Sequence, residues 1–145
     1  MIDALDHFVL LCPDIAAGTK AYETLLGRAP DWRASAGGAA TVLFRVENTA
    51  LELMAPHGDD GAAPRLRELT ADGPALTSLA FRAANIDTAH HNLARRGLAP
   101  DSIRPGESTD LLSGKTRRWQ RFRCRDDAMA GIKTFILQLE GGFSP

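Results

Sequence analysis

The segment LDHFVLLCPDI, residues 5–15, decides the fold, because it joins the end of an apolar strand to the start of a helix. Proline cannot continue a strand ladder, so Pro13 ends the strand. Asp14 is a favoured N-cap residue, and an apolar stripe continues over residues 15–26 until Gly27 ends the helix. Three further strand-like runs follow, at residues 32–36, 40–46 and 49–54. The first part of the chain therefore has the order strand, helix, strand, strand, strand.

The same order begins again after a short helical linker. Residues 78–81 form the next expected strand, Asn85 is an N-cap, and a helix over residues 86–96 ends at Gly97. Three pairs of segments echo one another: LGRAP (26–30) and RGLAP (96–100), FRV (44–46) and FRC (122–124), LEL (51–53) and LQL (137–139). Such an ordered repeat predicts an α+β protein of two tandem βαβββ modules. We expect the first module at 1–61, a linker with a short helix at 62–74, and the second module at 75–145, together forming one compact domain.

The repeated modules, opening with LDHFVLLCPDI and closing with LELMAP, resemble the vicinal oxygen chelate superfamily, which includes glyoxalases, bleomycin-resistance proteins and extradiol dioxygenases. The resemblance covers nearly the whole chain. It implies curved mixed sheets around a ligand pocket, with the helices on the convex face. The superfamily hosts many chemistries, so the fold alone does not define an activity.

Composition narrows the class of partner. The chain has 145 residues, is 44% hydrophobic and carries a formal net charge of -1, which suits a soluble domain with a real core. A nucleic-acid or membrane-surface binder would carry a clear basic excess, so we expect neither partner. No apolar run is long enough to span a bilayer, and the first residues are acidic where a signal peptide is basic. These features favour a cytoplasmic protein.

Strand alternation places two chemically active side chains on one face. His7 shares one face of its strand with Val9 and Leu11. On the later strand Glu52 points to the face opposite that of Leu51 and Leu53. In the resembled family this face lines the pocket, and these two positions carry metal ligands. The resemblance therefore makes His7 and Glu52 candidate catalytic residues and candidate ligands for Zn, Ni, Fe or Mn.

The second module departs from that ligand pattern. The order of the two modules matches His7 with Ser78, and the LEL/LQL echo matches Glu52 with Gln138. Of these two counterparts, only Gln138 offers even a weak metal ligand. Catalytic zinc sites usually have three protein ligands, so we expect an incomplete site with low metal occupancy. The alternative is that His7 and Glu52 form a hydrogen-bonded pocket pair without any metal.

The segment KTRRWQRFRC, residues 115–124, is unusually basic. Alternation places Trp119, Arg121 and Arg123 opposite the apolar face, together with Arg117, and the FRV/FRC echo matches Arg45 to Arg123. Guanidinium groups interleaved with an aromatic ring suit a planar anion, so these residues are candidate substrate-binding groups. The alternative is a solvated strand face paired with nearby carboxylates.

Two functions remain in competition. The first is a divergent glyoxalase-like enzyme, of lyase, isomerase or dioxygenase type, acting on a small, oxygenated, anionic organic molecule. The second is a metal-free binding or sequestering protein in which Trp32 and Trp119 stack on the ligand.

A curved sheet must cover its concave face and edges, and we expect a homodimer, with the pocket either inside one chain or shared.

Overall fold

The structure is a computed structural model that describes residues 1–140, apart from the side chain of Leu76. The second expected module ends at residue 145, so its last five residues lie outside the described part. The strands are β1 (Ile2–Leu11), β2 (Trp32–Ala36), β3 (Ala39–Val46), β4 (Thr49–Pro56), β5 (Ala75–Ala83), β6 (Arg104–Thr109), β7 (Thr116–Cys124) and β8 (Lys133–Leu139). The helices are α1 (Ile15–Leu26), α2 (Ala63–Leu69), α3 (Ile86–Arg95) and the 3-10 helix η1 (Asp126–Met129).

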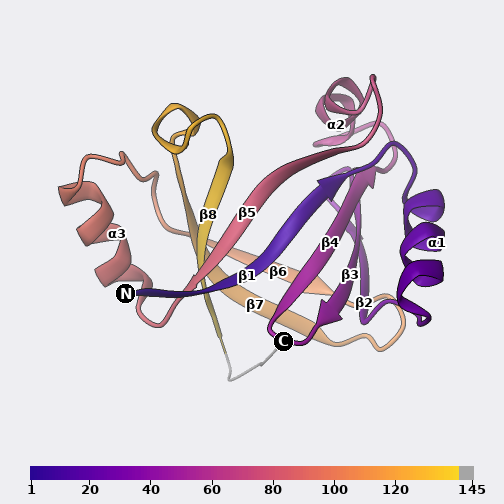
Figure 1. The fold of residues 1–145 in the computed structure, drawn as a ribbon, viewed down its shortest axis with the longest axis horizontal. Helices are drawn as coiled ribbons and strands as arrows, with labels where there is room; N and C mark the ends of the chain where they lie inside the picture. The colour runs from indigo at the N-terminus through magenta and orange to yellow at the C-terminus, as the bar shows by residue number, and fades with distance from the viewer. Residues whose placement is uncertain (141–145) are drawn as a thin grey trace.

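All eight strands belong to one mixed sheet, in the order β2-β3-β4-β1-β5-β8-β7-β6. Each half contains one parallel pair, β1 with β4 and β5 with β8, and the halves join through the antiparallel β1–β5 pair. The sheet curls strongly, as Figure 1 shows. The predicted α+β class and the eight strands of two βαβββ units are therefore confirmed.

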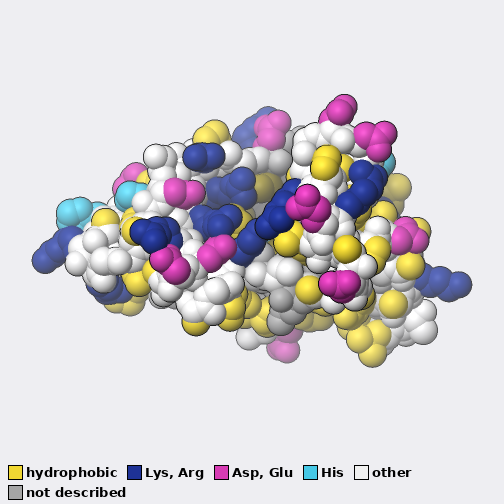
Figure 2. Space-filling view, turned by 90° about the horizontal axis from the view of Figure 1, so that it is seen from above, with side chains coloured by type: hydrophobic (Ala, Val, Ile, Leu, Met, Phe, Trp, Pro, Cys, Tyr) yellow, Lys and Arg dark blue, Asp and Glu magenta, His cyan; other side chains and the backbone are white. Residues whose placement is uncertain are grey.

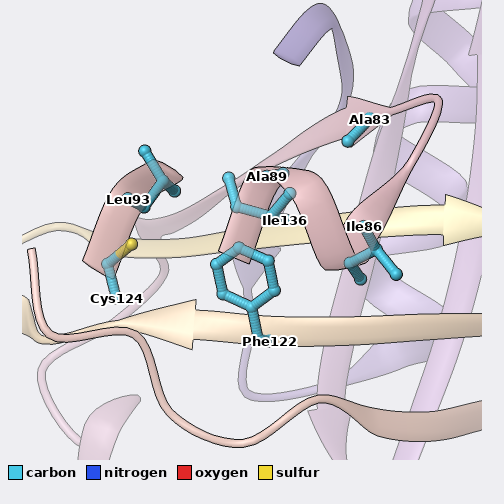
Figure 3. Packing of buried hydrophobic residues seen from close by; sticks show 7 residues of the cluster. All are labelled: Ala83, Ile86, Ala89, Leu93, Phe122, Cys124 and Ile136. Atoms are coloured by element: carbon cyan, nitrogen blue, oxygen red, sulfur yellow. The ribbon is translucent and has the colours of Figure 1, made fainter. Parts of the chain in front are cut away.

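Two long helices cover the convex side of the sheet, one for each half (Figure 1). Asp14 caps α1 by accepting a hydrogen bond from the Ala16 backbone N–H at 3.1 Å, and Asn85 caps α3 through the Thr88 N–H at 3.0 Å. Helix α3 packs on β7 and β8 (Figure 3), in a cluster of Ala83, Ile86, Ala89, Leu93, Phe122, Cys124 and Ile136. Helix α1 covers the matching cluster around Phe44 and Leu53.

The linker helix α2 has a different position. Leu66 is buried against Val9 and Leu11, whose side chains point to the concave side of β1, and Leu69 packs beside it. These contacts place α2 over one end of the concave face. The expectation that helices lie on the convex face therefore holds for α1 and α3, whereas α2 closes the hollow of the sheet.

The two edge strands of the sheet meet. The Trp32 indole N–H on β2 donates to the Ser108 hydroxyl on β6 at 2.8 Å. Next to it, Asp110 accepts from the Arg33 backbone N–H at 3.0 Å, and the Leu111 N–H donates to the Arg33 carbonyl at 2.8 Å. We call this the β2–β6 seam. It nearly closes the sheet on itself, so the concave side becomes a hollow inside one chain.

None of the helices in the described residues has the length and apolar character that crossing a bilayer requires.

Candidate active site

The hollow of the sheet is a cavity of about 690 Å³ lined by residues of both halves of the chain. Most of its wall is apolar, from strands β1, β2, β3, β4, β7 and β8 and from helix α2. The polar and charged side chains among its lining residues include Asp6, His7, Glu52, Ser78, Arg117, Arg121, Arg123 and Lys133. An apolar chamber with a few convergent polar groups is the usual form of a small-molecule site.

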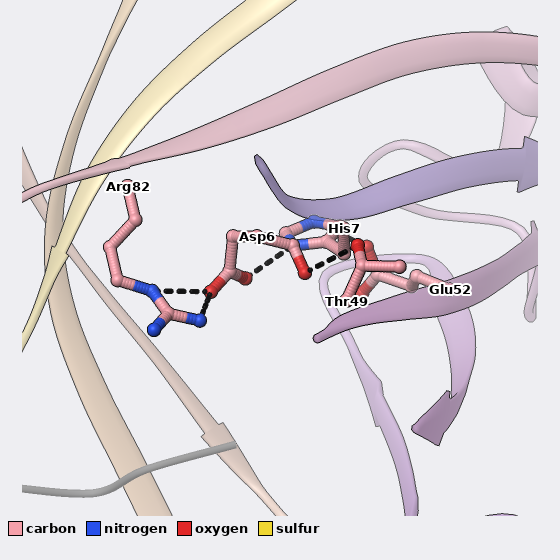
Figure 4. A network of polar contacts seen from close by, with 5 residues as sticks. All are labelled: Asp6, His7, Thr49, Glu52 and Arg82. Atoms are coloured by element: carbon pink, nitrogen blue, oxygen red, sulfur yellow. Dashed lines mark hydrogen bonds and ion pairs between the residues drawn. The ribbon is translucent and has the colours of Figure 1, made fainter. Parts of the chain in front are cut away.

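A chain of charged groups crosses the cavity wall at β1 and β4. His7 Nδ1 lies 2.7 Å from an oxygen of Asp6, and His7 Nε2 lies 3.3 Å from Glu52 Oε2 (Figure 4). Asp6 is 9% exposed and also accepts two hydrogen bonds from Arg82, at 2.7 and 3.0 Å. The β1–β5 ladder is irregular between Leu5 and His7, so the adjacent residues Asp6 and His7 both line the cavity.

The imidazole of His7 is held in its charged form by its neighbours. Burial by itself lowers the pKa of His7, but the hydrogen bonds and charges of Asp6 and Glu52 outweigh it and raise this pKa from 6.5 to about 9. Burial raises the pKa of Asp6, yet the hydrogen bonds and charges of His7 and Arg82 outweigh it, so the net pKa is lowered. Near neutral pH the site therefore presents an imidazolium between two carboxylates.

A second group of side chains, on β7 and β2, faces the row of Asp6, His7 and Glu52. The Arg117 guanidinium lies 4.7 Å from the ring centroid of Trp32 and 5.8 Å from that of Trp119, so it contacts both indoles. Burial lowers the pKa of Arg117, whereas the charges of Glu52 and Asp6 raise it, which places its charge within the field of the two carboxylates.

Gly106 on β6 makes room for the Trp119 ring. The two residues are directly opposite in the β6–β7 ladder, and a Cβ atom built on Gly106 would lie 2.3 Å from Trp119 Nε1. The φ angle of Gly106 is not in the left-handed region. The glycine therefore serves the packing of the indole rather than a special backbone conformation.

The remaining arginines of β7 lie further along the same wall. Arg121 and Arg123 lie over the ring of Phe135, at 5.5 and 6.0 Å from its centroid, and Arg123 is also paired with Asp126 at 2.9 Å. Both line the cavity. The structure thus brings together His7, Glu52, Trp32, Trp119, Arg121 and Arg123 of the residues that the sequence singled out.

Gln138 does not join them, and its predicted place was wrong. Its side-chain oxygen accepts a hydrogen bond from the Ile86 backbone N–H at 2.8 Å, on the face covered by α3. The LEL/LQL echo is out of register by three residues. With His7 matched to Ser78, Ala80 is the counterpart of Val9. Phe135 lies beside Ala80 as Glu52 lies beside Val9, so Phe135 is the counterpart of Glu52. A shift by an odd number of residues moves a side chain to the other face of a strand.

Arg45 is also displaced from its expected place. Val42 pairs with Leu53 in the first half as Phe122 pairs with Ile136 in the second, so Val42 corresponds to Phe122. Arg45 lies three residues after Val42, and its counterpart is therefore Arg125 and not Arg123. Arg45 lies two residues beyond Leu43 on the same face and is outside the lining of the cavity. Its charge lowers the pKa of Arg117.

The residues present do not fit a resident metal ion. His7 and Glu52 are the two strong donors, while their counterparts in the second half are the Ser78 hydroxyl and the phenyl ring of Phe135. Within residues 1–140, no group of three or more His, Cys, Asp or Glu side chains is arranged to hold a metal. The donor set therefore falls short of the usual catalytic site, and no step below depends on a metal.

Two residues of the site, Asp6 and Arg82, were not recognised in the sequence as site residues. Strict alternation puts Asp6 on the face opposite His7, and only a break in that alternation brings it to the cavity. Arg82 contacts the site through Asp6 alone. Arg117 was assigned to the correct face, and its position between two tryptophans distinguishes it from the other arginines of β7.

Comparison with known families agrees with this architecture. The family model of the glyoxalase-like domain matches residues 5–144, and the chain therefore belongs to that family, within the vicinal oxygen chelate fold. No curated protein matches the sequence.

Solved structures with the same fold include methylmalonyl-CoA epimerases. A variant of the Streptomyces coelicolor enzyme, in complex with 2-nitronate-propionyl-CoA, is 17% identical, with a TM-score of 0.78 and full coverage of both chains. The Mycobacterium tuberculosis enzyme is 18% identical, with a TM-score of 0.73, covering 94% of this chain and 88% of its own. A hypothetical protein from Bacillus halodurans is 13% identical, with a TM-score of 0.76 and 97% coverage of both chains. At these identities the likeness shows a shared fold.

Proposed function

We propose that this protein is an isomerase-type or lyase-type enzyme that moves a proton next to a carbonyl group of a small anionic molecule. The observation that carries the proposal is the His7–Glu52 pair inside the cavity, with the ring of His7 fixed from behind by Asp6. A carboxylate is a competent general base, and a fixed imidazolium is a competent hydrogen-bond donor to a developing oxyanion.

The reaction that suits these groups is enolisation. Glu52 accepts a proton from the carbon beside the carbonyl, the C–H bond breaks, and its electron pair moves onto the carbonyl oxygen. As Glu52 takes up this proton, the His7 Nε2–H that contacts Glu52 in the resting site donates its hydrogen bond to that oxygen instead, and the charge of Arg117 adds to the stabilisation of the anion. A proton returned to the opposite face of the same carbon inverts it, a proton returned to a neighbouring atom isomerises the substrate, and loss of a leaving group makes the reaction a lyase reaction.

The arginines of β7 support an anionic substrate. A guanidinium held between two indoles loses little conformational freedom when it binds a carboxylate, and the apolar wall removes that contact from bulk water. The methylmalonyl-CoA epimerases that share this fold are consistent with a reaction of this class.

A metal-free binding protein is the second candidate. The observation in its favour is the aromatic wall, in which Trp32 and Trp119 flank one cation in a largely apolar cavity. Such a wall suits a planar acid even when no reaction follows. The homodimer expected from the sequence and a cytoplasmic location remain parts of this proposal.

A binding experiment tests the anionic ligand. We expect small carboxylic acids to raise the melting temperature of the protein, and their neutral amides to leave it unchanged. In Arg117→Gln the affinity for the acids should fall by about tenfold or more, the loss of one charge-assisted hydrogen bond. Arg118→Gln is the matched control, because Arg118 is paired with Glu107 at 3.3 Å and is exposed. Equal affinity for acids and amides, or equal loss in both variants, contradicts the proposal.

A further inference from the structure

A second, smaller hollow adjoins the cavity on the β6–β7 side. Its volume is about 150 Å³, and it is lined by Asp101, Ser102, Arg104, Arg121, Phe122, Arg123 and Phe135. Arg121, Arg123 and Phe135 also line the large cavity, whereas Arg104 does not. The hollow is therefore a separate polar compartment that shares one wall with the active-site candidate.

Two arginines of this hollow lie close enough to repel each other. Arg104 on β6 lies directly opposite Arg121 on β7 in the antiparallel ladder. Like charges in directly opposite positions destabilise a strand pair. Among the described residues, neither side chain has a carboxylate within salt-bridge distance, although Arg121 contacts the ring of Phe135. Their positive charges remain available to a ligand.

The carboxylates nearby cancel this charge only in part. Asp101 accepts a hydrogen bond from the Arg123 backbone N–H at 2.6 Å, which directs one of its oxygens to the main chain. Asp126 pairs with the Arg123 guanidinium, and it holds that group in place. Three arginines and one aspartate line the hollow, so the lining has a net positive charge. Figure 2 shows that lysine and arginine side chains also gather in a band across the middle of one face of the molecule.

We propose that Arg104, Arg121 and Arg123 form a subsite for a phosphoryl or pyrophosphoryl group. Several guanidinium groups around a small polar hollow suit a multiply charged tetrahedral anion better than a single carboxylate, because each oxygen can accept separate hydrogen bonds. Arg121 and Arg123 line both hollows, so a ligand bound in the cavity lies beside the subsite. In assigning the subsite to the same ligand, the inference rests on the proposed function, and it makes that ligand a phosphorylated organic acid.

The test uses pyrophosphate as the probe and the intact protein without substrate. Binding is measured by calorimetry at fixed ionic strength, with acetate as the reference anion, for wild type, Arg104→Ala and Arg118→Ala. Arg104 lies outside the large cavity, so its removal leaves the His7–Glu52 pair in place. Arg118 is the matched control, because it is an exposed arginine of β7 already paired with Glu107.

We expect pyrophosphate to bind more tightly than acetate, and Arg104→Ala to weaken it by about tenfold, while Arg118→Ala changes it by less than about twofold. A Glu52→Gln variant should bind pyrophosphate as wild type does, so a failure of the proposed proton transfer is distinguishable from a failure of the subsite. Absence of pyrophosphate binding, or equal weakening in both arginine variants, overturns the proposal.

Discussion

At the scale of single residues, the site depends on how Asp6 and Glu52 share His7. A lone buried histidine loses its charge, because burial penalises the ion. Here one carboxylate contacts each ring nitrogen, and Arg82 keeps Asp6 in its ionised form. The consequence is a fixed imidazolium donor inside an otherwise apolar cavity, which is the feature that the proposed chemistry needs.

The first prediction concerns the pH dependence of stability. The pKa of folded His7, about 9, lies above its ordinary value of 6.5. The protonated ring therefore stabilises the folded state fully below pH 6.5, and this contribution is lost as the pH rises through 9. The full difference is on the order of 3 kcal/mol. The free energy of unfolding, measured with denaturant at pH 6 and pH 9, should fall over this range.

Glu52→Gln is the informative variant for that prediction, and His91→Gln, at an exposed position on α3, is its control. Removing the Glu52 charge should lower the pKa of His7 toward 6.5, as an NMR titration of the ring protons would show. The pH dependence of unfolding should shrink with it. An unchanged His7 pKa in Glu52→Gln would contradict the account of the pair.

The second prediction concerns Gly106. In Gly106→Ala the new methyl group overlaps the Trp119 ring, so the indole must move away from Arg117. We expect a loss of stability of about 1–3 kcal/mol, typical of overpacking, and weaker binding of carboxylic acids. Near-UV circular dichroism and tryptophan fluorescence report the indole directly. Gly114→Ala is not a suitable control, because its φ of +74° strains any side chain. Thr24→Ala, at an exposed position on α1 outside the cavity lining, serves instead. Unchanged tryptophan signals in Gly106→Ala would contradict this packing.

At the scale of elements, the β2–β6 seam decides whether the cavity is enclosed. Asp110 is its anchor: hydrogen bonds from Ser113 and from the Arg33 backbone N–H lower the pKa of this carboxyl to about 2. The seam has far fewer hydrogen bonds than a full strand ladder. It is therefore the place where the curled sheet opens most easily.

The third prediction follows from that anchor. Asp110→Ala leaves the Arg33 and Ser113 N–H groups without their acceptor, which costs about 1–3 kcal/mol for a buried group. Hydrogen exchange should accelerate at Arg33 and Leu111 much more than in the central strands. In wild type the same stabilisation should be retained above pH 3.8 and lost as the pH falls through 2. Uniform acceleration across the whole sheet would contradict a local opening.

The elements themselves follow from the sequence where local chemistry defines them. The ends of these elements have residues that favour them in any protein: a proline after the strand, N-cap side chains and a C-cap glycine. They are Pro13, Asp14, Asn85 and Gly27. The register of β8 is different, because LQL copies LEL in composition but not in position. What sets that register is the pairing of Phe135 with Ala80 and of Ile136 with Phe122, and neither contact is local in sequence. The site could be predicted on β1, β4 and β7, and not on β8, for this reason.

At the scale of the whole molecule, the two halves form one cavity through the antiparallel β1–β5 pair. Both halves contribute to its wall, and the seam closes it within the same chain. The bulge that brings Asp6 to the wall, and the curling that joins β2 to β6, arise only when the whole sheet is assembled. Neither has a local sequence signal.

The fourth prediction concerns stoichiometry. Because the described residues of both halves of one chain line the cavity, each chain should bind one carboxylic-acid ligand, whether or not the protein forms the expected homodimer. Calorimetry gives the number of ligands per chain, and sedimentation equilibrium gives the number of chains in the particle. One ligand for two chains, with binding lost on dilution to monomers, would show that the cavity is completed by a partner.

The central claim is that Glu52 removes a proton from a carbon beside a carbonyl group. Its most direct measurement is solvent deuterium incorporation, followed by NMR, into small carboxylates that carry an acidic C–H bond, including substituted malonyl thioesters. We expect wild type and Arg118→Gln to catalyse exchange at the same carbon, and Glu52→Gln to be slower by about 100-fold or more. Exchange at an equal rate in Glu52→Gln, or ligands that bind in the cavity and never exchange, would contradict the claim, and the second result would favour a binding protein.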